Sequence, residues 1–470
     1  MPAVIRTDYR EQCAPYMAEF LGAFFVSISH TCAVLNGNTV WAATAVGFAV
    51  MISMYSMAVV SGGLLNPSLT VTFGVCGRLR WRTVLGYCFS QCSAGMLAGC
   101  VAWALQAGES TEPGANLPSS CGWKGLVVEM IYTTTICFVA LCVMERGSAT
   151  KGCGPKHPKN QSFALAVGFV SIAGNHAVAQ LSLGTFNPSS TLAFAVLTQF
   201  GTVDKARVTW LLCAELVAVQ LASVMPAVMM WSFVQPKEAP ARFEQLPPQT
   251  EETPCLDEQD NASANMSSRL ACESIGTFMV VFTMQAARVP YDIGTDMDAS
   301  SMATTTTAVP ADVFAATPAS WAVGCILVSM VYSVGSISGS HFNPAVTLAI
   351  VCTGRGWCQP FEGLLYFASQ GTIALAAGLA CGVLRSGGEV GRHSGYEVVA
   401  LGPRSNYTWA CVGITEMIFT STLALIVLCT TTVTSPKYSK APSVRSFHVG
   451  LAIGMCMAAG AYALEPITWG

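Results

Sequence analysis

One short motif, an asparagine followed by proline and a small residue, recurs in this chain and each time opens an apolar stretch. The copies at 66–68, 187–189 and 343–345 read Asn-Pro-Ser, Asn-Pro-Ser and Asn-Pro-Ala. Asparagine favours the N-cap of a helix, and proline at the first helical position sacrifices no hydrogen bond. The apolar run that follows is about half of the roughly 20 residues needed to span a bilayer. Each motif therefore predicts a short helix that starts inside a hydrophobic protein and aims its positive end at something buried.

Composition places these motifs in a membrane. Of the 470 residues, 52% are hydrophobic and 10% are charged, whereas a soluble domain has about 25% charged residues. A net charge of -3 gives no reason to expect a nucleic-acid partner. The 20 cysteines lie mostly in apolar segments without any Cys-x-x-Cys pair, so we interpret them as small buried residues and expect no metal site.

Apolar segments of membrane length divide the chain into two parts. The first part, unit 1 (15–234), has them at about 15–35, 40–60, 82–106, 123–146, 161–181 and 207–234. The second part, unit 2 (269–470), has them at about 269–286, 318–336, 361–384, 407–432 and 446–464. We expect a polar tail at 1–14, a solvated Pro-rich and acidic linker at 235–268, and a disordered polar loop at 287–317. The predicted fold class is an all-α multi-pass membrane protein.

The second part repeats the first. Asn66 recurs as Asn343, and Glu19 recurs as Glu273 in a similar setting. Within the first part, three spans and one half-length helix occur twice, and an odd number of spans in each half makes the halves inverted. The same interval places a fourth motif just beyond Gly470, so we expect unit 2 to lack its second half-length helix and its sixth span.

Basic loops predict the orientation. Loops at 78–82 and 146–159 carry most of the Lys and Arg of unit 1 and lie on the same side. The positive-inside rule then puts the N-terminus and the linker in the cytoplasm. The loop at 385–404 also carries arginines, on the side that this scheme places outside. Nothing in the sequence indicates which membrane holds the protein.

Two half-length helices from inverted repeats should meet near the middle of the membrane, with Asn66 facing Asn187. Irregular backbone at that depth is tolerated only where it is buried in protein or lines a watery path. Each asparagine can cap its helix and still aim an N–H at a lumen, while two positive helix ends oppose cations. This pattern predicts passive passage of neutral, hydrogen-bonding solutes. The candidate pore residues are Asn66, Pro67, Ser68, Asn187, Pro188, Ser189, Asn343, Pro344 and Ala345.

Taken together, these motifs resemble the aquaporin, or major intrinsic protein, family. The resemblance rests on 18–22, 61–68 and 187–189 in the first part, and on Glu273 and 338–345 in the second. It implies an aquaporin-like inverted-repeat bundle, a channel for water or small uncharged solutes that is usually tetrameric and uses no cofactor. Two units in each chain would let two chains copy a tetramer.

The resemblance also implies a role for acidic residues inside the spans. They should brace the loops that carry the half-length helices, because an ionisable group in a membrane needs a partner. Direct contact with the solute is the alternative. The four residues are Glu19, Glu129, Glu273 and Glu416. Glu215, in the last span of unit 1, has no evident partner in the sequence.

A second constriction, the selectivity filter, is implied beyond the asparagine pair, at Val46, Asn175, Gly184 and Ser190. In the family the last position usually holds arginine, and water-specific members have phenylalanine where Val46 stands. His176 lies one place from the usual histidine and could substitute by a small shift, or could simply pack between helices. Without the arginine the constriction should be wider, so we expect water and also glycerol, urea or ammonia to pass.

Two other functions stay open. One is a non-conducting structural membrane protein on the same fold, in which substitution of Asn66 and Asn187 would change nothing. The other is a coupled secondary transporter, since inverted repeats with broken helices also serve that class. We expect no enzyme, because the sequence has no His-Glu-x-x-His, Gly-x-Ser-x-Gly or phosphate-loop pattern.

Overall fold

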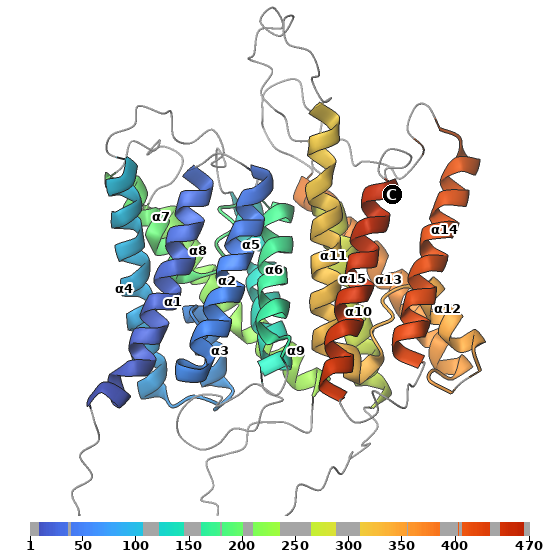
Figure 1. Ribbon diagram of the computed structural model, residues 1–470, viewed down its shortest axis with the longest axis horizontal. Helices are drawn as coiled ribbons and strands as arrows, with labels where there is room; N and C mark the ends of the chain where they lie inside the picture. The colour runs from blue at the N-terminus through green and yellow to red at the C-terminus, as the bar shows by residue number, and fades with distance from the viewer. Residues whose placement is uncertain are drawn as a thin grey trace, which may run out of the picture.

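The computed structural model describes residues 9–35, 39–106, 122–144, 161–178, 181–200, 210–235, 265–287, 311–354, 356–385, 403, 407–432 and 442–464. Within these ranges the chain forms two helical bundles that lie side by side (Figure 1). The tail at 1–8, most of the linker, at 236–264, and residues 288–310 of the predicted loop lie outside the described residues.

Within the described residues the first bundle contains six crossings and two half-length helices. Its elements are α1 (Tyr9–Leu35), α2 (Thr39–Ser61), α3 (Pro67–Val75), α4 (Trp81–Gln106), α5 (Trp123–Met144), α6 (Phe163–Val178), α7 (Pro188–Phe200), α8 (Trp210–Ala222) and α9 (Val224–Val234). The short helices α3 and α7 enter from opposite ends of the bundle, α3 in its lower half and α7 in its upper half (Figure 1). Both begin at the proline of an Asn-Pro motif.

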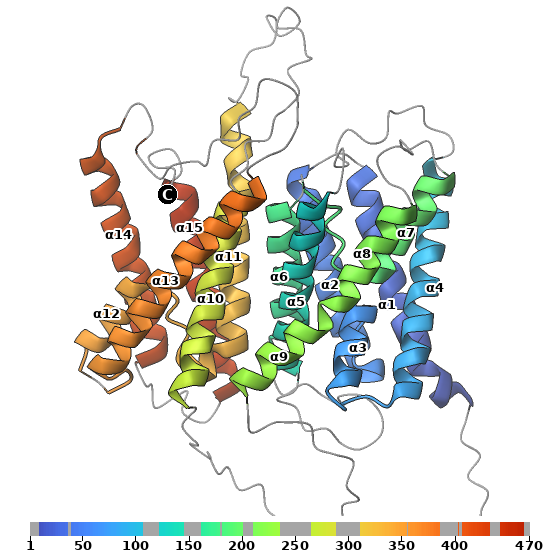
Figure 2. The ribbon, with the colours of Figure 1, turned by 180° about the vertical axis from the view of Figure 1, so that it is seen from behind.

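The last crossing of this bundle is a tilted helix with a break at Ser223, between α8 and α9 (Figure 2). Pro226 follows the break and has no N–H to bond back to the preceding turn, which accounts for the interruption. The Ser223 hydroxyl donates to the carbonyls of Val219, at 2.9 Å, and Met130, at 3.3 Å. The break is therefore held against α5.

The second bundle contains α10 (Met266–Ala286), α11 (Ala311–Ser338), α12 (Pro344–Cys352), α13 (Pro360–Arg385), α14 (Trp409–Val427), which ends in a π-helical turn (Leu428–Thr432), and α15 (Pro442–Leu464). The expectation of a disordered loop across 287–317 is wrong at its end, because α11 already begins at Ala311. The first turns of α11 contain several alanines, the residue with the highest helix propensity, so the helix begins before its apolar part.

Eight helices within the described ranges are long and apolar enough to cross a membrane. They are Gln12–Val34, Trp41–Ser61, Trp81–Leu105, Trp123–Met144, Trp210–Val234, Ala319–Ser338, Pro360–Leu384 and Trp409–Thr431. Two shorter apolar helices accompany them, Phe163–Ala177 and His448–Leu464. Arg269 on α10 forms an ion pair with Glu362 on α13. The protein is thus an integral, multi-pass membrane protein.

The bundles meet where α5, α6 and α9 of the first face α10 and α11 of the second (Figure 2). The Ser329 hydroxyl donates to the carbonyl of Ala166 at 2.9 Å. The Tyr132 and Thr283 hydroxyls lie 2.8 Å apart in a buried contact. Side-chain and backbone hydrogen bonds therefore join the bundles, in addition to apolar packing.

Corresponding helices cross closely within each bundle. A Cβ added to Gly47 on α2 would lie 2.8 Å from the carbonyl oxygen of Gly168 on α6. A Cβ added to Gly324 on α11 would lie 2.8 Å from the carbonyl oxygen of Gly454 on α15. Any larger residue would force these helices apart, so glycine sets the spacing of both crossings.

Candidate functional site

The tips of the two short helices α3 and α7 form the centre of the site. Asn66 caps α3, its Oδ1 accepting from the Ser68 N–H at 2.9 Å. Asn187 caps α7 in the same way, accepting from the Ser189 N–H at 3.0 Å. Both short helices therefore begin as the Asn-Pro motif predicts, with asparagine as the N-cap and proline at the first helical position.

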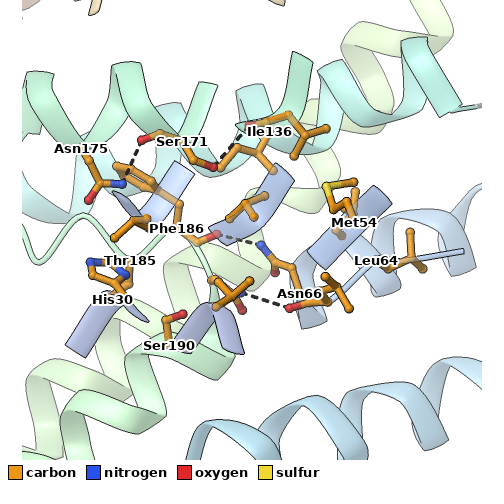
Figure 3. A pocket seen from close by; sticks show the side chains of 17 residues that line it. His30, Met54, Leu64, Asn66, Ile136, Ser171, Asn175, Thr185, Phe186 and Ser190 are labelled. Carbon is orange, nitrogen blue, oxygen red and sulfur yellow. Dashed lines mark hydrogen bonds between the residues drawn. The ribbon is translucent and has the colours of Figure 1, made fainter. Parts of the chain in front are cut away.

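Each asparagine also reaches the loop that leads into the opposite helix. The Asn66 Nδ2 donates to the carbonyl of Phe186 at 3.0 Å, and the Asn187 Nδ2 donates to the carbonyl of Leu65 at 3.2 Å (Figure 3). A primary amide carries two N–H groups, so one N–H of each asparagine stays available after this exchange. Both side chains line the same cavity.

The residue before each asparagine has a strained backbone. Leu65 has φ 55° and Phe186 has φ 46°, in the left-handed region that costs a side-chain-bearing residue about 1–3 kcal/mol. This conformation turns the carbonyl of each residue toward the opposing asparagine. Because the conformation is unfavourable, a buried group must hold the backbone in place.

Glu19 on α1 holds the first loop. Its Oε1 accepts from the Ser61 hydroxyl at 2.5 Å and the Leu64 N–H at 3.0 Å. Its Oε2 accepts from the Leu65 N–H and from the Gln91 amide, both at 2.7 Å. The side chain is fully buried, and these four donors satisfy the carboxylate.

Glu129 on α5 holds the second loop in the same way. One oxygen accepts from the Ser182 hydroxyl and from the Thr185 N–H at 3.0 Å. The other accepts from the Phe186 N–H at 2.9 Å and from the Gln220 amide at 3.0 Å. Both half-length helices are therefore positioned by a buried carboxylate from a long helix.

Two glutamines complete these networks. Gln91 on α4 also donates to the Thr70 hydroxyl at 2.9 Å, and Gln220 on α8 to the Thr191 hydroxyl at 3.0 Å. Gln220 was not singled out from the sequence. The available signal was a glutamine inside an apolar span, together with a threonine in the first turn after each Asn-Pro motif.

A cavity lies around the asparagine tips. Of the four predicted selectivity-filter positions, the cavity is lined by Val46, Asn175 and Ser190. Gly184 is buried in the adjoining loop with φ 63° and does not line the cavity, whereas Thr185 next to it does. The structure thus brings most of the predicted residues together in one space.

The remaining motif residues support the tips. Pro67, Ser68, Pro188 and Ser189 are buried in the first turns of their helices and lie outside the lining. The Ser189 hydroxyl donates to the carbonyl of Gln91 at 2.6 Å, which ties α7 to α4.

His176 packs between α2 and α6, the second of the two roles that the sequence left open. The sequence left open that it substitutes for a histidine of the filter, but its side chain lies outside the cavity, with Nε2 3.4 Å from the Thr44 hydroxyl. One residue along a helix is a rotation of about 100°, and here Asn175 takes the position that faces the cavity.

Several lining residues were not found from the sequence. They include His30, Met54, Ile136 and Ser171. On α1, α2 and α6 the lining residues recur at intervals of four, as in Ser171 and Asn175, so one stripe of each helix faces the cavity. Polar residues at this interval in an apolar span were the signal that could have found them.

The second bundle repeats one half of this arrangement. Glu273 on α10 accepts from the Ser338 hydroxyl at 2.7 Å, the His341 N–H at 3.0 Å, the Phe342 N–H at 2.7 Å and the Gln370 amide at 3.0 Å. The backbone before the motif is again left-handed, with φ 48° at Phe342. The brace at α12 therefore matches the brace at α3, bond for bond.

The other half of the arrangement differs. The Asn343 Oδ1 caps α12 through the Ala345 N–H at 2.8 Å, but within the described residues no opposing loop faces its amide nitrogen. Asn343 and Pro344 are half-buried and Ala345 is exposed. Glu416 is half-buried on α14, and the loop that it was expected to brace lies outside the described residues, so its role stays a prediction.

Comparison with known protein families matches residues 6–153 and 260–466 to the family described as Major intrinsic protein. The match covers more than half of the chain. The chain belongs to the major intrinsic protein family. It is therefore grouped with membrane channels and not with enzymes.

Relatives within this family include plant aquaporins. Aquaporin NIP1-3 of Oryza sativa subsp. japonica is 28% identical over 193 residues, covering 38% of this chain and 63% of the relative. Aquaporin NIP1-4 of the same plant is 33% identical over 133 residues, covering 27% and 49%. Probable aquaporin NIP7-1 of Arabidopsis thaliana is 28% identical over 204 residues, covering 39% and 70%. The matches to the two rice proteins thus span about half to two thirds of their length.

A solved structure also aligns with part of the chain. The X-ray structure of the aquaglyceroporin from Plasmodium falciparum aligns with a TM-score of 0.40 and 19% identity, covering 48% of this chain and 98% of that chain. Because this similarity is low, the fold of this major intrinsic protein is taken from its own helices and hydrogen bonds.

Proposed function

We propose that the first bundle, α1 to α9, is a passive channel for water and small neutral solutes that runs through the cavity between α3 and α7. The reciprocal bonds of Asn66 and Asn187 to the opposing loops carry this proposal. They leave one N–H of each asparagine without a protein acceptor in the cavity. A solute that offers a lone pair, such as water or a hydroxyl group, can accept from both.

The charge distribution around the tips favours neutral solutes. The N-terminal ends of two helices point at the same place, and each is equivalent to about half a positive charge. A cation would meet both positive ends without any carboxylate in reach, because Glu19 and Glu129 are fully buried and saturated with donors. The cavity therefore suits uncharged molecules.

The small side chains of the filter support a solute broader than water. Val46 is buried on α2, and Ser190 is buried on α7 with its hydroxyl 3.4 Å from that of Ser27. Neither side chain extends far into the cavity. We infer that glycerol, urea or ammonia passes in addition to water.

For the second bundle, we propose that residues 269–470 are a second, incomplete unit that follows unit 1 (15–234) and the linker (235–268). The matching brace of Glu273 and the paired glycines of α11 and α15 support this reading. Within the described residues Asn343 meets no opposing tip, and this unit packs on the first bundle through α10 and α11.

We also propose that two chains associate, with the N-terminus and the linker on the cytoplasmic side. Within one chain, α11 of the second bundle packs on α6 of the first. The helix that corresponds to α11 in the first bundle is α2, whose outer face is exposed and apolar at Phe48 and Ile52. A second chain could cover that face.

The basic loop at Arg78–Arg82 supports the orientation, with the N-terminus and the linker on the cytoplasmic side.

Stopped-flow measurements on proteoliposomes test the channel. The wild-type protein should raise water, glycerol and urea permeability without any ion gradient. Asn66→Leu and Asn187→Leu should each lower water flux about tenfold, since a cavity donor and a cross-loop bond are lost together, at about 0.5–1.5 kcal/mol each. Asn343→Leu is the matched control and should leave flux unchanged.

Three results would contradict the proposal. If Asn66→Leu and Asn187→Leu conduct like the wild type, the fold serves as a scaffold. If flux requires a proton or sodium gradient, the protein is a transporter. If water passes while glycerol and urea do not, the filter is narrow.

A further inference from the structure

Two polar side chains of α6, Ser171 and Asn175, line the cavity, and the proposed channel mechanism does not use them. They lie one helical turn apart on the same face of α6, about 6 Å along its axis. The residues of α2 that line the cavity are Val46, Val50 and Met54, which offer no strong hydrogen-bonding group. The cavity therefore has a polar side on α6 and an apolar side on α2.

The side-chain amide of Asn175 is oriented so that its oxygen stays open. Its Nδ2 donates to the carbonyl of Ser171 at 2.9 Å (Figure 3). Because a carbonyl oxygen can only accept, this contact fixes which end of the amide is nitrogen and which is oxygen. Among the described residues Oδ1 has no hydrogen-bond partner, and unlike fully covered unpaired atoms such as Thr133 Oγ1 it keeps accessible surface. Asn175 thus offers an acceptor to the cavity that it lines.

The hydroxyl of Ser171 is oriented in the same way. It donates to the carbonyl of Val167 at 3.3 Å, so its O–H is used within the helix and the lone pairs of its oxygen remain. The side chain is 6% exposed and lines the cavity. Helix α6 therefore presents two acceptors in a row.

Gly174 holds this part of α6 close to the asparagine tips. A Cβ added to Gly174 would lie 2.7 Å from Cε2 of Phe186, so the helix packs directly on the loop before α7. The carbonyl of Phe186 is the one that accepts from Asn66. The acceptors of Ser171 and Asn175 therefore line the same cavity as the free N–H groups of the tips. A solute in this cavity meets donors from the tips and acceptors from α6.

We propose that Ser171 Oγ and Asn175 Oδ1 form a paired acceptor site on α6 that favours solutes with two separate donor groups, urea above all. Urea donates from one amino group to each acceptor, while its carbonyl oxygen accepts from an asparagine tip. A solute with one amino group bonds to only one acceptor at a time. This site depends on the proposed channel function of the same cavity.

Threonine and valine have nearly the same shape, so a matched pair of variants at Asn175 separates hydrogen bonding from the width of the cavity. In Asn175→Thr the hydroxyl bonds back to the carbonyl of Ser171, as the Ser171 hydroxyl does to Val167, and its oxygen stays an acceptor. Asn175→Val fills the same volume without an acceptor. Ser171→Thr and Ser171→Val repeat the comparison one turn along, which covers the case in which a variant at Asn175 does not fold.

The readout is the permeability of proteoliposomes to urea and to acetamide, corrected for empty liposomes and normalised to the protein inserted. The two solutes have the same planar shape, but acetamide has a methyl group where urea has its second amino group. Urea permeability of Asn175→Val should be about two- to tenfold below that of Asn175→Thr, the factor for one lost hydrogen bond. Acetamide permeability of the two should agree within about twofold, because its amino group still bonds to Ser171.

Equal urea permeability in the valine and threonine variants would overturn the paired site. An equal loss of urea and acetamide permeability would overturn it too, because a single acceptor would then decide passage. A wild-type protein that passes no solute at all would instead defeat the proposed function.

A measurement on the unaltered side chain tests the contact directly. Wild-type protein with ¹³C-labelled asparagine in lipid bilayers should show a side-chain carbonyl resonance of Asn175 that shifts as urea is added. Asn343, whose Oδ1 caps α12 away from this cavity, is the control, and its resonance should not move. An Asn175 resonance that is insensitive to urea would rule out the contact.

Discussion

The two bundles contain the same glutamate-centred hydrogen-bond network and differ in whether the asparagine beside it contacts a second loop. In each, a buried glutamate, Glu19 or Glu273, binds a serine, two backbone N–H groups and a glutamine, and so holds the start of a half-length helix. In the first bundle Asn66 then reaches the loop before α7, whereas in the described second bundle Asn343 caps its own helix and reaches no loop. One half-length helix with its glutamate therefore suffices for the brace, whereas the cavity lies between two such helices.

This comparison separates two uses of the same motif. An Asn-Pro tip and its glutamate suffice to begin a short helix inside a membrane protein, because every bond involved lies within one half-repeat. A path for solute requires a second tip that supplies acceptors for the first and closes the space around it. The same set of bonds thus lies beside a cavity in one bundle and meets no opposing tip in the described part of the other.

The largest difference is expected when the brace itself is removed. Glu129→Ala leaves the N–H groups of Thr185 and Phe186 buried without a partner, at about 1–3 kcal/mol each. It also releases the left-handed backbone at Phe186. Water flux should fall by about tenfold or more, on the same energy scale. Stopped-flow light scattering on proteoliposomes measures it.

Glu273→Ala is the control for this change, because it removes the same bonds from the second bundle. It should lower stability and leave flux per inserted protein close to that of the wild type. Equal loss of flux in the two variants would mean that the second bundle takes part in conduction.

A smaller difference is expected at the glycine crossings. A Cβ at Gly47 would lie 2.2 Å from Ile172 Cγ1, and one at Gly324 would lie 2.6 Å from Ala458 Cβ. Each alanine should therefore destabilise the protein by about 1–3 kcal/mol through overpacking. Only Gly47→Ala should also reduce flux, because α2 and α6 line the cavity. Thermal unfolding in detergent and water flux measurements test both variants. A loss of flux in Gly324→Ala would contradict the expectation that only the first bundle conducts.

The smallest effect is expected at the contact between the bundles. Tyr132→Phe removes the bond to the Thr283 hydroxyl while keeping the aromatic packing against Phe186, whose ring centroid lies 5.4 Å away. The variant should lose about 0.5–1.5 kcal/mol of stability and conduct normally. Calorimetry of the reconstituted protein would detect it. A clear drop in flux would show that the second bundle positions the loop before α7.

Sequence reasoning described the elements well and the inner surface only in part. The half-length helices at Asn66 and Asn187 were predictable because capping depends on residues adjacent in the chain. His30 and Gln220 were missed because a membrane helix is apolar on most sides, so its sequence does not say which side faces a cavity. His176 was considered for the same reason, although Asn175 faces the cavity.

By itself, the sequence determined that this chain forms membrane-length helices interrupted by capped half-length ones, since hydropathy and capping act over one or a few helical turns. It also marked Glu19 and Glu129 as acids that need buried partners. Only the tertiary structure decided that Asn66 bonds to the carbonyl of Phe186, 120 residues away, and that Asn343 has no such acceptor among the described residues. Contacts at that separation depend on how whole helices pack, and helix packing is not encoded in the local spacing of residues.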